Sequence, residues 1–215
     1  MKTTPKRSTR APRRWATFIR VAIAASILVG LALGCGPGIS DYPYAKEPDP
    51  RSQEYVVGVP DRLSVQVWRN PELSANVQVR PDGTITLPLI GDIAAADHTP
   101  TELRHTITER LKEYVKVDVS AVTVTVAGID SYRVTVTGNV NNPGVQQSSH
   151  FLTVGEAIAL AGGPNRFASP EETELVRTRP DGKVVRIPIR YDLLMVGMAP
   201  EQDLVLMRGD LVFVP

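Results

Sequence analysis

The sequence predicts an α+β protein built from two small mixed modules, and three observations indicate this class. From Tyr55 onward, apolar side chains recur at every second position, as in strands that bury one face. Two segments, which begin after Thr99 and Thr153, instead carry the start signals of helices. The tetrapeptide Arg-Pro-Asp-Gly occurs twice, and each copy is a turn signal between two strand-like segments.

The first module opens with a strand that ends near Trp68, in which apolar and polar residues alternate from Leu63 onward. A second strand begins at Val77. The turn at residues 80–83 follows, because its proline fixes φ and its glycine accepts a positive φ. Residues 84–91 are expected to return as one strand, and the proline inside it marks a sheet edge or a bulge.

A helix follows, since Thr99 is a suitable N-cap, Pro100 fits the first turn and Glu102 completes a capping box. Its apolar face is expected to contain Leu103, Ile107, Leu111 and Tyr114. The next strand, over residues 117–126, changes the phase of its apolar alternation, which indicates a bulge or a new strand.

The second module begins with a strand over residues 132–138 and a turn at 141–144, where Asn-Asn-Pro-Gly is a strong turn signal. Thr153 and Glu156 form another capping box, and the short helix that they begin should end at the glycine pair 162–163.

The rest of the second module reads as a hairpin and a last strand. Residues 174–189 are expected to pair about the second Arg-Pro-Asp-Gly, at 179–182. We interpret the two hairpins as similar, without evidence of a sequence repeat. Residues 208–210 spell the cell-adhesion tripeptide Arg-Gly-Asp, which we interpret as a turn before the closing strand.

Residues 1–34 have the pattern of an export signal. They contain seven basic residues and no acidic one, and the apolar run 21–33 is uncharged. A basic head, a short apolar run and a small residue before a cut are typical of a secretory signal, and the run is shorter than the ~20 apolar residues of a membrane span. Arg13 and Arg14 are interpreted as ordinary charge of this head rather than as a twin-arginine signal.

The chain has one cysteine, Cys35, directly after this run. Its setting resembles the lipid-attachment site of bacterial lipoproteins, although Ala32 and Leu33 stand in the reverse of the usual order. We expect cleavage before Cys35 and its acylation, and the alternative is an uncleaved anchor. Gly36, where an aspartate would resemble an inner-membrane retention signal, favours the outer membrane. Residues 35–53 contain four prolines and are expected to form an extended tether.

The charge balance limits the partners of the mature chain. Of the 24 basic residues, seven precede Cys35, so the remainder has 17 against 23 acidic residues, a net charge of about −6. Phosphate backbones bind positive surfaces, so no nucleic acid partner is expected. With Cys35 acylated, no thiol is left for a disulfide, and stability must come from the hydrophobic core.

In their order and spacing, these segments resemble the outer-membrane polysaccharide export proteins. The similarity to the export domain of that family lies in residues 55–68, 79–93 and 99–115. The similarity to its soluble-ligand-binding β-grasp (SLBB) domain lies in residues 132–146, 152–165 and 208–215. One departure is Pro60-Asp61, where the family often has Gly-Asp.

The resemblance implies a domain organisation. It comprises a lipoprotein signal peptide over 1–34, a lipidated tether over 35–53, a polysaccharide export domain over 54–128 and an SLBB β-grasp domain over 129–215. It also implies a lipid-anchored protein at the periplasmic face of the outer membrane in a Gram-negative cell. There it would form a homo-oligomeric ring that carries capsular polysaccharide or exopolysaccharide from an inner-membrane co-polymerase.

The capsule-type members of the family continue into an amphipathic helix that lines an outer-membrane pore. The candidate helix near the end of this chain, over residues 191–199, is too short to cross about 30 Å of hydrocarbon at ~1.5 Å per residue. We therefore expect a separate outer-membrane β-barrel to complete the passage.

The sequence contains no recognisable enzymatic, metal-binding or cofactor-binding motif, so catalytic residues, metal ligands and cofactors are expected to be absent. His98, His105 and His150 are isolated in the sequence. Asp82 and Asp181 are interpreted as turn residues rather than as a glycosidase pair.

Ligand-binding residues are not identified by the sequence. Trp68 and Tyr132 either stack on sugar rings or pack in a core or an interface, and packing is favoured. Three other functions stay open: a monomeric sugar-binding lipoprotein, a scaffold that ties the co-polymerase to the outer membrane, and an enzyme that acts on the glycan.

Overall fold

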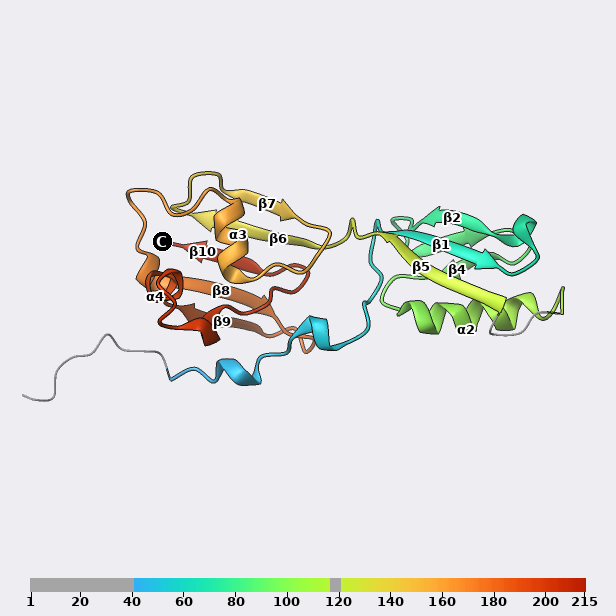
Figure 1. Cartoon of the computed structure of the whole chain (residues 1–215), viewed down its shortest axis with the longest axis horizontal. Coiled ribbons are helices and arrows are strands. Elements are labelled where there is room, and N and C mark those ends of the chain that lie inside the picture. The colour runs from blue at the N-terminus through green and yellow to red at the C-terminus, as the bar shows by residue number, and fades with distance from the viewer. Residues whose placement is uncertain (1–40, 117–120) are drawn as a thin grey trace, which may run out of the picture. The chain divides into compact units, whose positions relative to one another are not determined.

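The computed structural model describes residues 41–116 and 121–215, and Figure 1 shows its helices and strands. Cys35, the apolar run 21–33 and the expected change of phase within 117–126 therefore involve residues that lie outside the described part.

A three-stranded antiparallel sheet organises the first module, in the order β2 (Ala75–Gln78), β1 (Arg62–Val67) and β5 (Val122–Gly128). The strand predicted from Leu63 to Trp68 is confirmed, and its apolar residues face the core while its polar ones do not. Because β1 pairs with a neighbour on each side, it is the most enclosed strand of this sheet.

The segment expected to be one strand over residues 84–91 is instead a hairpin of β3 (Thr84–Leu87) and β4 (Gly91–Ala94). The chain reverses directly after β3, where Leu89 has φ +71° and the N–H of Ile90 bonds to the carbonyl of Pro88 at 2.8 Å. Proline has no N–H for a sheet ladder, so it ends the strand here instead of lying within it.

Helix α2 (Pro100–Leu111) begins with the predicted capping box: the N–H of Glu102 donates to the Thr99 hydroxyl, and the N–H of Thr99 donates to the Glu102 carboxylate. Three of the four residues predicted for its apolar face are buried. The fourth, Tyr114, is 57% exposed, because the helix ends before it and it no longer follows the helical period.

A five-stranded mixed sheet forms the second module. Its order is β7 (Gly144–Gln147), β6 (Arg133–Gly138), β10 (Leu211–Val214), β8 (Thr173–Thr178) and β9 (Val184–Ile189). The closing strand β10 lies in the centre, parallel to β6 and antiparallel to β8. The chain thus completes its sheet only with its last residues (Figure 1).

Two short helices complete the second module, α3 (Val154–Leu160) with the second predicted capping box and α4 (Tyr191–Met195). The glycine pair after α3 has φ +79° and +76°, so the predicted helix stop is confirmed. Both Arg-Pro-Asp-Gly turns are also confirmed, since Gly83 and Gly182 have φ near +80° and each N–H bonds back to the arginine carbonyl.

Each module has its own hydrophobic core, one centred on β1 and α2 and the other on the five-stranded sheet and α3. Each module combines sheets with helices, which confirms the predicted α+β class. In the part of the chain that the structure describes, no helix is both long enough and apolar enough to cross a membrane.

The N-terminal segment (residues 41–53) is not the extended tether that its composition predicted. It contains two 3₁₀ turns, η1 (Tyr44–Lys46) and η2 (Pro50–Ser52). Tyr44 is 6% exposed within the second core, and its hydroxyl donates to the carbonyl of Pro188 at 2.6 Å. The prediction is wrong here because burial of an aromatic ring outweighs the local preference for extended chain.

Candidate functional site

A buried carboxylate, Asp61, connects the start of the first module to the start of the second. Its Oδ1 accepts the backbone N–H groups of Asp130 and Ser131, at 2.8 and 2.7 Å. Its Oδ2 accepts the Gly58 N–H at 2.8 Å, the Tyr55 hydroxyl at 2.6 Å and the Ser131 hydroxyl at 3.0 Å. We call these five residues the Asp61 cluster. None of the five donors carries a formal charge.

Tyr55 is a permanent donor in this cluster. Burial raises the pKa of its hydroxyl to about 12, and the hydrogen bond to Asp61 acts in the same direction. The phenol therefore keeps its proton throughout the physiological range and holds the carboxylate in one orientation.

A second buried cluster holds the N-terminal segment against the second module. We call it the Arg177 cluster, and it consists of Glu47, Arg177, Arg179 and Asp210. Arg177 lies on β8 and is 1% exposed. Its guanidinium donates to Asp210 at 2.6 Å and to Glu47 at 3.0 Å, while Arg179 pairs with the other oxygen of Glu47. Two guanidinium groups thus face two carboxylates.

Opposing effects act on the charged groups of the Arg177 cluster. Burial acts to raise the pKa of Glu47, but hydrogen bonds from Tyr42 and Arg179 and the charges of both arginines bring it below its usual value. Burial acts to lower the pKa of Arg177, but Asp210 and Glu47 raise it above its usual value. Glu47 and Arg177 therefore stay charged at neutral pH.

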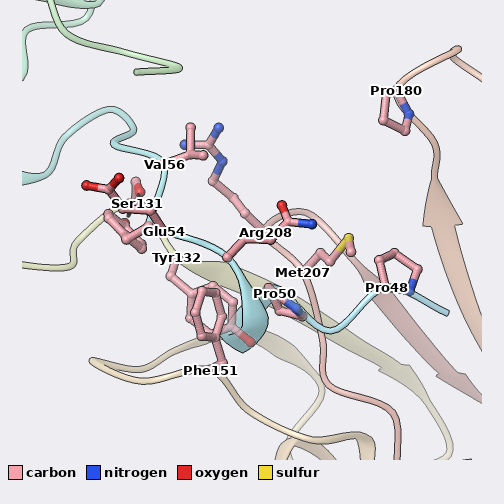
Figure 2. A pocket seen from close by; sticks show the side chains of 12 residues that line it. Pro48, Pro50, Glu54, Val56, Ser131, Tyr132, Phe151, Pro180, Met207 and Arg208 are labelled. Carbon is pink, nitrogen blue, oxygen red and sulfur yellow. Dashed lines mark hydrogen bonds between the residues drawn. The ribbon is translucent and has the colours of Figure 1, made fainter. Parts of the chain in front are cut away.

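A pocket of about 390 Å³ lies beside these clusters. Figure 2 shows Pro48 and Pro50 of the N-terminal segment on its wall, together with the rings of Tyr132 and Phe151. These two rings meet edge to face, with centroids 5.2 Å apart. Proline, valine, methionine and aromatic side chains make up most of its lining, and its polar lining residues include Glu54 and Ser131, so the pocket offers a mainly apolar surface.

The two aromatic candidates have different environments. Tyr132 is buried, and its hydroxyl donates to the Leu206 carbonyl and accepts the Leu152 N–H, so packing is confirmed for it. Trp68 is 71% exposed and lines a second, open pocket with Arg69. Trp68 does not pack in a core, because β1 ends directly before it and its side chain lies outside both cores. Packing in an interface, the other part of the prediction, stays a prediction.

The structure does not bring the polar candidates together. His105 and His150 are exposed, and His98 bonds to the carbonyl of Ala96. Across residues 41–116 and 121–215, no group of three or more His, Cys, Asp or Glu side chains could hold a metal ion.

Asp82 and Asp181 each cap their own turn, as predicted. Hydrogen bonds from Thr84 and from Lys183, respectively, lower the pKa of each carboxyl below its usual value. A glycosidase acid requires a raised pKa, so this environment is the opposite of the one that such chemistry needs.

Sequence reasoning missed the residues that matter most in these clusters. Asp61 is signalled only by its place between a proline and a strand, and Arg177 stands in an ordinary strand pattern. Residues 208–210 do form the predicted turn, but the aspartate of that tripeptide is the buried partner of Arg177. The arrangement positions chain segments and shows no catalytic constellation in the described residues.

Comparisons with known proteins agree with this description. Residues 49–127 match the family model of polysaccharide biosynthesis/export proteins, and residues 133–188 match the SLBB domain. The exopolysaccharide production protein ExoF of Rhizobium meliloti is 32% identical over an alignment of 128 residues that covers 54% of this chain and 30% of ExoF.

Two further relatives are named for export or transport. The EPS I polysaccharide export outer membrane protein EpsA of Ralstonia solanacearum is 30% identical over an alignment of 185 residues that covers 74% of this chain and 47% of EpsA. The polysialic acid transport protein KpsD of Escherichia coli is 29% identical over 148 residues, 67% of this chain and 25% of KpsD. The chain thus spans less than half the length of each of these relatives.

Proposed function

Because the chain belongs to the polysaccharide biosynthesis/export protein family, we propose that it is an outer-membrane lipoprotein whose copies assemble into a periplasmic conduit for capsular polysaccharide or exopolysaccharide. The observation that carries this proposal is the succession of an export domain and an SLBB domain in one chain. The role is transport rather than catalysis, in line with the relatives that are named for export.

In this proposal, residues 1–34 are removed as a signal peptide and Cys35 carries the acyl chains. Residues 54–128 are the export domain and residues 129–215 the SLBB domain. Several acyl chains give lasting membrane attachment, since each buried methylene contributes about 0.8 kcal/mol.

The packing of the N-terminal segment determines which module the lipid anchor would hold at the membrane. Cys35 lies six positions before Asp41, and an extended chain spans at most ~3.6 Å per residue, so the link covers at most about 20 Å. Tyr44 and Glu47 are held by the second module. The membrane anchor would therefore keep the second module, rather than the first, next to the outer membrane.

The transported polymer needs weak contacts, because a tightly bound polysaccharide would stall. We propose that a ring lumen offers a hydrated path in which polar groups exchange sugar hydroxyls with water. An inner-membrane co-polymerase would supply the polymer, and a separate outer-membrane β-barrel would pass it to the exterior.

Three measurements test the proposal. Light scattering of the detergent-solubilised full chain should give the mass of a closed oligomer, and the mass of the N-terminal peptide should show acylated Cys35. Deletion of the gene should trap polymer in the periplasm. Monomers without acylation would instead favour a sugar-binding protein, and reduced polymer without periplasmic trapping would favour a scaffold.

A further inference from the structure

The end of α4 exposes a group of large apolar side chains. Met195, Val196 and Met198 are 64%, 65% and 71% exposed. Within the described residues, no other stretch of four exposes three large apolar side chains. Single exposed apolar residues are ordinary on protein surfaces, whereas a contiguous group marks a contact with another apolar phase.

The backbone holds this group in one conformation. The N–H of Met198 donates to the carbonyl of Leu193, and the N–H of Gly197 donates to that of Leu194, at 2.9 and 3.0 Å. Gly197 has φ +73°, so these bonds form the Schellman motif that ends many helices. Tyr191 and Ala199, on either side of the loop, are buried. The loop is therefore fixed at both ends while its apolar side chains face solvent.

Its position relates it to the lipid anchor. The turn η6 (Pro200–Gln202), which directly follows the loop, packs against η1 of the N-terminal segment. Figure 1 shows α4 and the start of the described chain at the same end of the second module. Cys35 precedes Tyr44 by nine residues, which span at most about 32 Å when extended.

The charged residues around the loop indicate whether it would bind a membrane by electrostatic attraction or by apolar burial. Along the chain its charged neighbours are Glu201, Asp203 and Arg190, which is paired with Asp192 at 2.7 Å. The turns packed against α4 and η6 add the acidic Glu171 and Glu172 of η5 and one exposed basic residue, Lys46 of η1. One lysine among several carboxylates gives little attraction to anionic headgroups, so this loop is suited to partition by apolar burial instead.

We propose that Met195, Val196 and Met198 form a membrane-contact loop that inserts into the lipid leaflet holding the acyl chains of Cys35. This inference rests on the proposed lipid anchor. The loop and the anchor are then two attachment points on one module, and together they fix its orientation, which a single attachment point cannot do.

The test uses a single reporter thiol. In the full lipidated chain Cys35 is acylated, so Met198→Cys can be labelled alone with an environment-sensitive fluorophore. Tyr114→Cys, an exposed site in the first module, is the matched control. Vesicles of phosphatidylethanolamine and phosphatidylglycerol, with and without a nitroxide-labelled lipid, provide the membrane. We expect a blue shift and nitroxide quenching at 198, unchanged by added salt, and neither effect at 114.

A second arm separates this inference from the lipid anchor. Cys35→Ser protein with an N-terminal hexahistidine tag is held on vesicles that contain a nickel-chelating lipid, and the same labels are read. If Cys35 proves unacylated but residue 198 is quenched in this arm, the anchor fails and the loop stands. If the bound protein leaves residue 198 as exposed as 114, the inference is overturned. A blue shift at 198 that needs no lipid and grows with protein concentration would also overturn it, because it would indicate contact between copies.

Discussion

The Asp61 cluster and the Arg177 cluster both bury carboxylates, but they satisfy them in different ways. Asp61 accepts five hydrogen bonds from uncharged donors, three of them from Asp130 and Ser131 nearly seventy positions later in the chain. Glu47 and Asp210 instead share the guanidinium of Arg177, which lies 130 positions after Glu47.

This difference indicates how each connection fails. Where a carboxylate accepts many neutral donors, removing one donor lowers the free energy of unfolding only by the contribution of one hydrogen bond, about 1 kcal/mol. A buried charge that serves two partners fails at once, because its removal takes the cation from Asp210 and leaves Glu47 with Arg179 alone. The Arg177 cluster should therefore depend on one residue, and the Asp61 cluster on several.

The largest expected effect is that of Arg177→Met, which leaves Asp210 buried without a cation and Glu47 paired with Arg179 alone. We expect a loss of about 3–5 kcal/mol in the free energy of unfolding, measured by urea denaturation. Arg186→Met is the control, because Arg186 is exposed and pairs with Glu174 at 2.6 Å, and it should cost no more than about 1 kcal/mol. Equal losses in the two variants would contradict the special role of Arg177.

Asp61→Asn is expected to cost about 3 kcal/mol in the same measurement. The substitution keeps the shape but turns an amide NH₂ group toward donors, which leaves two or three buried hydrogen bonds unmade. Asp92→Asn removes an exposed carboxylate that pairs with Arg80 and should change stability by about 1 kcal/mol at most. An Asp61→Asn protein as stable as this control would show that the cluster does not hold the two modules.

Glu47→Gln should cost about 2 kcal/mol near neutral pH, and the difference from wild type should depend on pH. The pKa of Glu47 is lower in the folded protein than its usual value, so its contribution is complete above pH ~4.3 and is lost as the pH falls through the folded pKa. Urea denaturation of both proteins across this range should show the two stabilities converging in acid. A difference that stayed constant with pH would rule out the proposed ionisation.

The smallest expected effect is that of Tyr55→Phe, about 1 kcal/mol, because four other donors to Asp61 remain. Thermal denaturation should resolve this loss against Tyr114→Phe, which alters an exposed ring and should leave the melting temperature unchanged. A larger loss than that of Asp61→Asn would reverse the expected order.

Features set by neighbouring residues were predictable from the sequence. Both capping boxes, both Arg-Pro-Asp-Gly turns and the glycine stop of α3 depend on contacts within a few positions, and the structure confirms each. The errors at residues 84–91 and at Tyr114 concern where an element ends, and these ends depend on single residues such as Pro88.

Features set by distant residues were not predictable. The composition of the N-terminal segment predicted an extended tether. Nothing in the sequence near Glu47 indicates that it forms a buried ion pair with Arg177. The membrane-contact loop is likewise invisible in the sequence, where its apolar residues read as part of a short helix.

The sequence by itself determined the class of the fold, most of its elements and the resemblance to polysaccharide export proteins, because alternation, caps and turns are local and the two matched domains follow in order. Only the tertiary structure decided which charges are buried and which apolar side chains stay exposed. Burial depends on which groups the fold places next to a residue. The neighbours that bury Glu47 and Asp61 come from distant parts of the sequence, whereas the described residues leave Met198 exposed.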